Sequence, residues 1–373
     1  MTHAGPRPDS GPSDSVDSGP RLRESLNQVP AYRAGQRPTE REDLVSFKVS
    51  SNENPYPPLP RVREAIAAAT AEINRYPDPA SADLVAALAS YHRVSEDEIA
   101  LGTGAVALCY QLAHCTVEPG DEVLYAWRSF EAYPIVSHVA GAVPVPVPLT
   151  VDGGHDLAAM AAAVTDRTRL IFVCSPNNPT GTVVSKTQLV EFLDAVPSDV
   201  VVVLDEAYIE FNRDPDAADG LADHRHRSNV VILRTFSKAY GLAGLRVGYA
   251  IADPRVTEAL RKTALPFGIS GLAQVAAVAS LADDLELLAR VESLAVERDR
   301  VACEMRDAGW NPPASQANFL WLPLGERTGD FVTACETAGL TVRAFAGEGA
   351  RVTIAEPEAN DRLIAVCRDF GAS

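Results

Sequence analysis

Four short, unbroken apolar runs constrain the fold of this chain more than any other feature. They are rich in Val, Ile and Leu, and they occupy residues 122–125, 169–173, 200–204 and 229–233. Continuous apolarity, without alternating polar residues, is typical of strands that are covered on both faces of a mostly parallel sheet. Stretches with helical spacing separate the runs. The sequence therefore predicts an α/β fold with a doubly wound sheet.

The remaining patterns divide the chain into four parts. The first 27 residues are rich in Pro, Gly, Ser and Asp and cannot bury enough apolar surface to offset the entropy of ordering. A short apolar stretch at 44–49 predicts a first strand. Beyond residue 284 the pattern changes to a long helix at 287–308, short strands near 318–322 and 351–354, and a closing helix at 358–370. We expect a disordered tail at 1–27, an N-terminal arm at 28–45, a large domain at 46–284 and a smaller α+β domain at 285–373.

Composition excludes several classes of partner. The 373 residues carry a formal net charge of -17, which argues against nucleic acid and anionic membrane surfaces as partners. Six dispersed cysteines show no metal-ligand spacing, so we expect small core residues in a reduced, cytoplasmic setting and no metal. The sequence also shows no signal-peptide pattern and no stretch of membrane-spanning length. These features predict a soluble globular enzyme.

Lys238 lies in a Ser- and Gly-rich turn after the fourth apolar run, eight residues before Arg246. A lysine in this setting can hold an aldehyde as a Schiff base, while Thr235, Ser237 and Arg246 hold a phosphate. That combination predicts a pyridoxal phosphate site. The alternative interpretation is a surface lysine beside a flexible loop.

Polar residues also follow the second and third runs. Because ligands gather at the carboxyl ends of parallel strands, these residues are expected on the same rim as Lys238. Asp205, at the end of the third run, would keep the pyridine nitrogen of the cofactor protonated. Asn178 and Tyr208 would donate hydrogen bonds to its phenolic oxygen. A helix cap at Asp205 and an ordinary turn at Asn178 are the alternatives.

A Gly-x-Gly turn at 102–104 opens an apolar helix and exposes the backbone amides of Ala105 and Val106. Amides at a helix start bind phosphate well. Phe130 is a candidate to stack on the cofactor ring, with a plain core position as the alternative.

Several motifs occur together and in order, and through them the chain resembles the fold-type I aminotransferases that use pyridoxal phosphate. The narrower resemblance is to the histidinol-phosphate aminotransferase family, from about Val29 to the C-terminus. The motifs are Ser51-Asn52-Glu53-Asn54-Pro55-Tyr56, Arg75-Tyr76-Pro77-Asp78, Ser175 to Gly181, Asp205-Glu206-Ala207-Tyr208 and Ser237 to Arg246.

The resemblance implies a role for each matching residue. Lys238 would bond to the cofactor and later carry a proton between the substrate and the cofactor. Arg351 would bind the substrate carboxylate or its phosphate equivalent, with Tyr32 and Arg343 as secondary contacts. Tyr76 would reach the phosphate in the neighbouring subunit, so a homodimer with shared active sites is implied.

The substrate follows from one departure from the family pattern. Members that make histidine usually carry an acidic residue just after the Gly-x-Gly turn, where this chain has Ala105-Val106-Ala107. Through three segments the chain is similar to the actinobacterial aromatic amino acid, or phenylalanine, aminotransferases: Gly104 to Cys109, Trp127-Arg128-Ser129-Phe130 and Ser315 to Pro323. The implied reaction moves an amino group between phenylalanine, tyrosine or tryptophan and a 2-oxo acid such as 2-oxoglutarate. Histidinol-phosphate aminotransferase is the alternative.

Two rivals come from other classes. Gly102-x-Gly104-x-x-Ala107 formally fits the dinucleotide fingerprint of a nicotinamide-dependent dehydrogenase, although that reading leaves Lys238 without a role. A catalytically silent pyridoxal-binding scaffold is expected to lack the lysine or to carry a DNA-binding module, and neither applies here.

Overall fold

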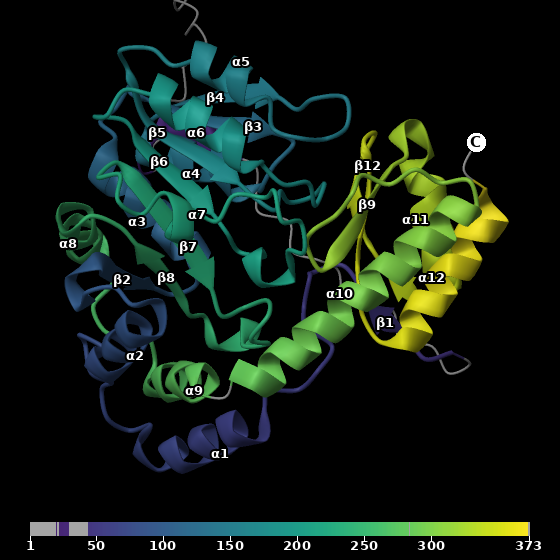
Figure 1. The fold of residues 1–373 in the computed structure, drawn as a ribbon, viewed down its shortest axis with the longest axis horizontal. Coiled ribbons are helices and arrows are strands. Elements are labelled where there is room, and N and C mark those ends of the chain that lie inside the picture. Colours follow the sequence, from purple (N-terminus) through teal and green to yellow (C-terminus); the bar gives the residue numbers. More distant parts are fainter. Residues whose placement is uncertain (1–19, 21, 30–43, 283, 372–373) are drawn as a thin grey trace, which may run out of the picture.

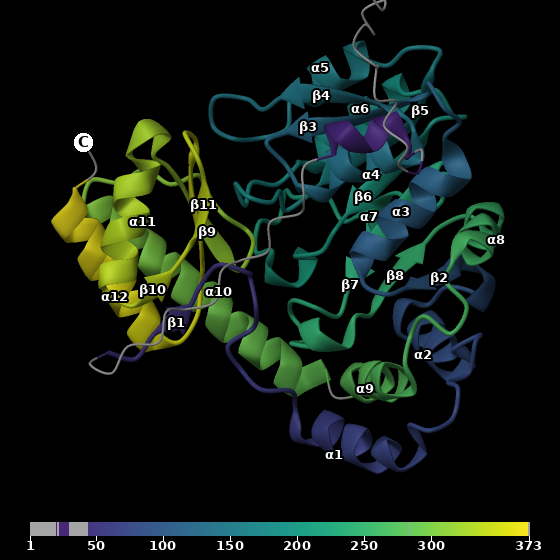
Figure 2. The ribbon, with the colours of Figure 1, turned by 180° about the vertical axis from the view of Figure 1, so that it is seen from behind.

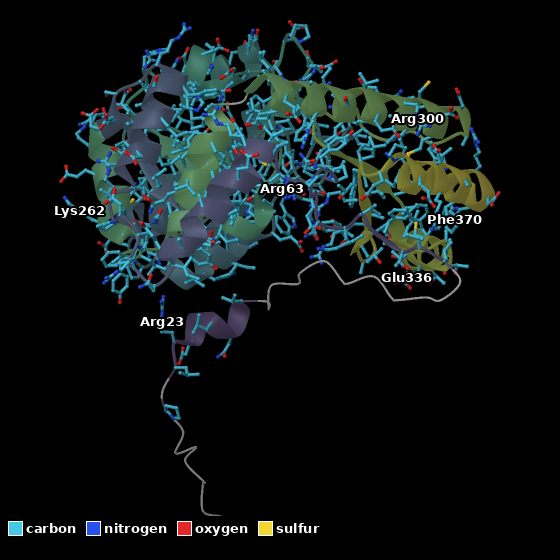
Figure 3. The ribbon with its side chains drawn as sticks, turned by 90° about the horizontal axis from the view of Figure 1, so that it is seen from below. Arg23, Arg63, Lys262, Arg300, Glu336 and Phe370 are labelled. Carbon is cyan, nitrogen blue, oxygen red and sulfur yellow. The ribbon has the colours of Figure 1, made fainter. Side chains whose placement is uncertain are left out.

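The computed structural model describes residues 20, 22–29, 44–282 and 284–371. Figure 1 shows a large α/β part and a smaller C-terminal part, with the long helix α10 (Asp284–Asp307) running between them. Figure 3, seen from below, shows Lys262 at the large-part end of the molecule and Phe370 at the C-terminal end. The predicted tail and arm lie mostly outside the described residues, as does Tyr32.

A seven-stranded sheet in the order β2-β8-β7-β6-β5-β3-β4 forms the centre of the large part. The four apolar runs are strands of this sheet, so the doubly wound, mostly parallel sheet is confirmed. They correspond to β3 (Glu122–Trp127), β5 (Thr168–Cys174), β6 (Val201–Asp205) and β7 (Val230–Thr235). All four are parallel to their neighbours among β3 to β7. β8 (Gly248–Ile251) is antiparallel to both of its neighbours, so the edge strand β2 (Ile99–Gly102) runs in the same direction as β7.

Alternate residues of the central strands enter two separate apolar cores, which explains why the runs are continuous. Val203 and Val231 pack with helices α3 (Ala105–Thr116) and α4 (Ala132–Ala140) on one face. Val202 and Ile232 belong to the core on the other face, with residues of α2 (Ala82–His92), α6 (Lys186–Ala195) and α9 (Gly271–Leu281). Each strand therefore has an apolar requirement on both faces. The remaining helices of the large part are α1 (Pro60–Ala69), α5 (Leu157–Ala162), α7 (Gly220–Asp223) and α8 (Pro254–Thr263).

The apolar-run criterion does not detect β4 (Val143–Pro148) or β8. In β4 every second residue is proline, which cannot donate to a sheet. The strand is tolerated because it pairs only with β3, at the edge of the sheet. β8 has four residues and begins with Gly248, so its apolar signal is weak.

The C-terminal part contains the expected long helix, short strands and closing helix. A three-stranded antiparallel sheet has the order β11-β12-β9 and packs with the helices. Its elements are β9 (Phe319–Pro323), α11 (Thr328–Thr337), β10 (Leu340–Thr341), β11 (Arg343–Phe345), β12 (Gly349–Thr353) and α12 (Pro357–Phe370).

The predicted strand at 44–49 shortens to β1 (Phe47–Lys48), and it does not join the large sheet. It pairs in parallel with β10, and Val49 accepts a hydrogen bond from Thr353 of β12. The sequence placed the start of the large domain at residue 46, but residues 47–49 add to the C-terminal part because its short β10 offers a free edge. The expectation of a disordered tail up to residue 27 is wrong at its end, because residues 24–27 and Gln28 of the expected arm form the 3-10 helix η1 (Glu24–Gln28) beside α4.

The cysteines behave largely as expected of small core residues. Cys109, Cys174, Cys335 and Cys367 are buried, whereas Cys303 is exposed. In the described part of the chain, no helix is both long and apolar enough to cross a lipid bilayer.

Candidate active site

A cavity of about 320 Å³ lies where the carboxyl ends of β5, β6 and β7 meet the start of α3 and the β11–β12 hairpin. Figure 2 shows β11 on the side of the C-terminal part that faces the large part. The volume falls within the range of small-molecule sites. The cavity is lined by Ala105, Val106, Phe130, Asn178, Asp205, Tyr208, Thr235, Ser237, Lys238, Arg246, Arg343 and Arg351 among others. Sequence reasoning proposed all twelve of these residues.

Lys238 follows β7, and its amine is buried in this cavity. Nζ donates a hydrogen bond of 3.1 Å to the carbonyl of Ser51. Burial, reinforced by the positive charge of Arg351, lowers the pKa of Lys238 from 10.5 to about 7. A large share of the amine is therefore neutral near neutral pH, which is the form that attacks an aldehyde.

Asp205 ends β6, the strand that pairs with β7, and its side chain is buried. Its carboxylate accepts hydrogen bonds from the Tyr133 hydroxyl at 2.7 Å and from the Ala207 amide at 3.2 Å. Burial raises the pKa of Asp205, while these two hydrogen bonds act against the rise. Within the described residues no cationic side chain forms an ion pair with this carboxylate, so a cation from a ligand is the natural partner.

Tyr208 and Asn178 are both connected by hydrogen bonds to the loop that carries Ser50 and Asn52, Asn178 through Arg351. The Tyr208 hydroxyl accepts a hydrogen bond of 2.9 Å from Nδ2 of Asn52, and burial raises the pKa of Tyr208. Asn178 accepts a hydrogen bond from Nη1 of Arg351, whose Nη2 donates to the Ser50 carbonyl at 2.8 Å. Arg351 thus joins the C-terminal part to two loops of the large part.

Hydroxyls and a guanidinium converge at the other end of the cavity. Thr235 donates to Ser237 at 3.0 Å, and Nη1 of Arg246 donates to the same Ser237 oxygen at 3.3 Å. The Arg246 guanidinium packs so closely over Gly104 that a Cβ there would overlap it. Gly104 also has φ +83°, which favours glycine.

The start of α3 completes this anion-binding end. Ala105 and Val106 are its first two residues, and their amides have no acceptor within the helix. β8 holds the helix start close, since a Cβ on Gly248 would lie 2.5 Å from the Ala105 nitrogen. Two helix amides, two hydroxyls and a guanidinium are the donor set that a phosphate requires.

Among the expected site residues that the structure describes, Tyr76 does not lie in this cavity. Tyr76 is 83% exposed and packs against Phe267, with ring centroids 4.7 Å apart. Phe130 does line the cavity, where its ring stands edge-on to Tyr133.

Sequence reasoning missed the residues that support the site from behind. Tyr133 belongs to α4 and donates a hydrogen bond to Asp205, 72 residues away in the sequence, so no local sequence pattern predicts this contact. Asn52 appears in a motif quoted for the resemblance. Its φ is +53°, a backbone conformation in which asparagine is enriched. Asn177 accepts from Ser129 at 2.7 Å and orders the turn before Asn178.

The geometry therefore joins a lysine with a lowered pKa, a buried carboxylate, an anion-binding set of donors and an arginine. These groups suit an anionic aldehyde and a carboxylate. Comparison with known proteins agrees: residues 46–366 match the family model of aminotransferase class I and II, and the chain belongs to this family.

Within the aminotransferases, the chain is similar to relatives named as aromatic amino acid aminotransferases. An aromatic amino acid aminotransferase of Streptomyces avermitilis is 58% identical, over 95% of this chain and 98% of its own. One from Thermobifida fusca is 57% identical, over 94% of this chain and 97% of its own. Among solved structures, a histidinol-phosphate aminotransferase from Sinorhizobium meliloti in complex with pyridoxal-5'-phosphate has 29% identity and a TM-score of 0.84, covering 96% of this chain and all of that one. The resemblance and the fold-type I assignment are confirmed.

The dehydrogenase alternative is wrong for a topological reason. The strand of a dinucleotide fingerprint lies inside the sheet, at the point where the strand order reverses. β2, which precedes Gly102-x-Gly104, is instead an edge strand that pairs with the antiparallel strand β8. Family membership and relatives named as aminotransferases also remove the silent-scaffold reading.

Proposed function

We propose that the protein is a pyridoxal phosphate enzyme that transfers amino groups from aromatic amino acids to a 2-oxo acid. One observation carries the proposal: Lys238, Asp205 and Arg351 come from three different elements and line one cavity of about 320 Å³. The lysine and the carboxylate suit the cofactor, and the arginine suits the amino acid carboxylate.

The residues present fit the cofactor. Asp205 is buried without a cationic partner among the described side chains, which is the arrangement a protonated pyridine nitrogen would complete. Ala105, Val106, Thr235, Ser237 and Arg246 would hold the phosphate. When bound, pyridoxal phosphate supplies an electron sink next to the substrate's α-carbon.

This chain's own residues then perform the acid and base work. Nζ of Lys238, with a pKa near 7, can take a proton from the α-carbon and give it back. Asn178 and Tyr208 would orient the ring through its phenolic oxygen. Arg351, already held by Asn178 and the Ser50 carbonyl, would fix the substrate carboxylate by a bidentate contact.

An aromatic side chain is favoured by the apolar wall of the cavity. Ala105, Val106, Phe130 and Phe345 all line it. Relatives at 57% and 58% identity are named aromatic amino acid aminotransferases, which supports the same substrate here. Burying a phenyl ring against such a wall contributes roughly 1.5–3 kcal/mol.

A homodimer with shared sites accounts for Tyr76. The Tyr76 ring is exposed together with Ile73, Leu265 and Phe267, of which Leu265 and Phe267 line a groove of about 810 Å³. Contiguous exposed apolar side chains are typical of interaction surfaces. A second copy seated here would cover them and bring Tyr76 of one copy to the cofactor phosphate of the other.

The test is a panel of amino donors, each assayed with 2-oxoglutarate. We expect kcat/KM for phenylalanine, tyrosine and tryptophan to exceed that for histidinol phosphate by about tenfold or more, as apolar pockets discriminate. A preference for histidinol phosphate would reverse the substrate assignment. Absence of a visible absorption band after adding pyridoxal phosphate would refute the cofactor assignment, with Lys238→Ala as the negative control.

A further inference from the structure

Glu131 and Arg343 form an ion pair on the wall of the active-site cavity. Nη2 of Arg343 lies 2.8 Å from Oε2 of Glu131, and both residues line the cavity. Arg343 belongs to β11, whereas Glu131 directly precedes α4 in the large part. None of the chemistry described so far requires Glu131.

The hairpin register places a second arginine beside the first. Arg343 pairs directly with Arg351 across β11 and β12, so both side chains project from the same face of the sheet. Phe345, two residues along, shares that face, and Cζ of Arg343 lies 5.5 Å from its ring centroid. The cavity therefore contains two guanidiniums and an aromatic wall.

The inference rests on the proposed function, which requires one cavity to accept two different substrate side chains. One cavity must accept an aromatic side chain from the donor and a second carboxylate from an acceptor such as 2-oxoglutarate. Arg351 can bind only the carboxylate that both substrates share. An arginine left without a counter-ion beside a phenyl ring would carry a large desolvation penalty, yet a distal carboxylate needs such an arginine.

We propose that Glu131 lets one pocket accept both substrates. It neutralises Arg343 while an aromatic side chain is bound, and it gives up Arg343 to the distal carboxylate of a dicarboxylic 2-oxo acid. Arg343 and Glu131 are thus specificity-determining residues for the two halves of the reaction.

Exposure indicates which partner moves. The Arg343 side chain is 12% exposed and the Glu131 side chain is 33% exposed, so Glu131 can turn towards water with less rearrangement. Glu131 occupies the N-cap position of α4, where the positive end of the helix dipole stabilises a carboxylate. Its charge is therefore supported even when Arg343 is engaged elsewhere.

The test measures binding of two unreactive acids to the holoenzyme by calorimetry. Glutarate and 3-phenylpropanoate share one carboxylate and differ at the distal group, which is a carboxylate or a phenyl ring. For Glu131→Gln we expect glutarate to bind about tenfold tighter, because Glu131 no longer competes with its distal carboxylate for Arg343. We expect 3-phenylpropanoate to bind about tenfold weaker, because Arg343 then lacks the carboxylate of Glu131 beside the phenyl ring. For Arg343→Gln we expect glutarate to weaken by about tenfold or more.

The double variant Glu131→Gln/Arg343→Gln should bind 3-phenylpropanoate as the wild type does and glutarate poorly. Glu348→Gln is the matched control, because it breaks the Arg128–Glu348 pair between the same loop and hairpin, away from the described cavity lining. It should move both affinities equally.

Equal shifts of both ligands in Glu131→Gln, or no shift, would overturn the role of Glu131. Failure of the wild type to transaminate phenylalanine would instead count against the proposed function.

Discussion

At the residue scale, the chemistry depends on how far burial shifts two ionisable groups in opposite directions. Burial lowers the pKa of Lys238 and raises the pKa of Asp205, and in each case it favours the neutral form. For Lys238 this produces a nucleophile. For Asp205 it produces a carboxylate that gains from a cationic partner such as a protonated ring nitrogen.

The lysine shift predicts how cofactor capture depends on pH. Only the neutral amine reacts, so the capture rate of the cofactor-free protein should rise with pH and level off above about 7, whereas an ordinary lysine with pKa 10.5 would still be rising. Stopped-flow absorbance after mixing with pyridoxal phosphate measures this. Arg351→Gln should move the midpoint upward, because a positive charge that lowers the pKa is removed. A midpoint near 10 in the wild type would contradict the assignment.

Asp205 and its hydroxyl partner predict a graded loss of activity. Asp205→Asn should lower kcat by on the order of 10²–10³-fold, because a neutral amide cannot stabilise a protonated ring nitrogen. Tyr133→Phe removes one hydrogen bond and should cost about tenfold. The ring at position 133 should remain stacked on Phe172, with centroids 4.4 Å apart. The unfolding profile of Tyr133→Phe should therefore match the wild type, so lost stability does not explain the lower activity. Wild-type kinetics in Tyr133→Phe would show that the bond does not position Asp205.

At the scale of elements, the phosphate cradle depends on how closely β8 approaches the start of α3. Gly248 pairs with Thr235 in the register of β7 and β8, and it also lies against the backbone of Gly104 and Ala105. One glycine therefore sets the distance between the hydroxyl donors and the helix amides.

Gly248→Ala should separate these two elements. A Cβ 2.5 Å from a backbone nitrogen forces a shift, and we expect a loss of about 1–3 kcal/mol in unfolding free energy together with weaker cofactor binding. Gly244→Ala is the matched control, since nothing lies within 4 Å of its Cβ and its stability should change by less than about 0.5 kcal/mol. Denaturant unfolding and cofactor titration measure both. Equal behaviour of the two variants would contradict the close-approach argument.

At the scale of the whole molecule, the proposed dimer would place Tyr76 and Lys238 of one site on different chains. Tyr76→Ala and Lys238→Ala should each be impaired alone. Mixed dimers should regain activity, because each contains one site with an intact Lys238 from one chain and an intact Tyr76 from the other. Light scattering should give twice the 39.8 kDa chain mass. If mixing restores nothing, Tyr76 does not act across the interface.

The sequence by itself determined the central strands and the polar residues that follow them at the rim of the cavity. Strands buried on both faces must be apolar throughout, so β3, β5, β6 and β7 are visible as runs, and the residues after three of them mark the rim. Lys238, Asp205 and Asn178 follow from that rule, because position at a strand's end is a local property.

Only the tertiary structure decided which residues from distant elements meet there. Tyr133 reaches Asp205 from a helix, Asn52 reaches Tyr208 across 156 residues, and Glu131 meets Arg343 across 212. β1 joins β10 instead of the large sheet for the same reason. Such contacts depend on how complete elements pack, and no periodicity within a single segment encodes them.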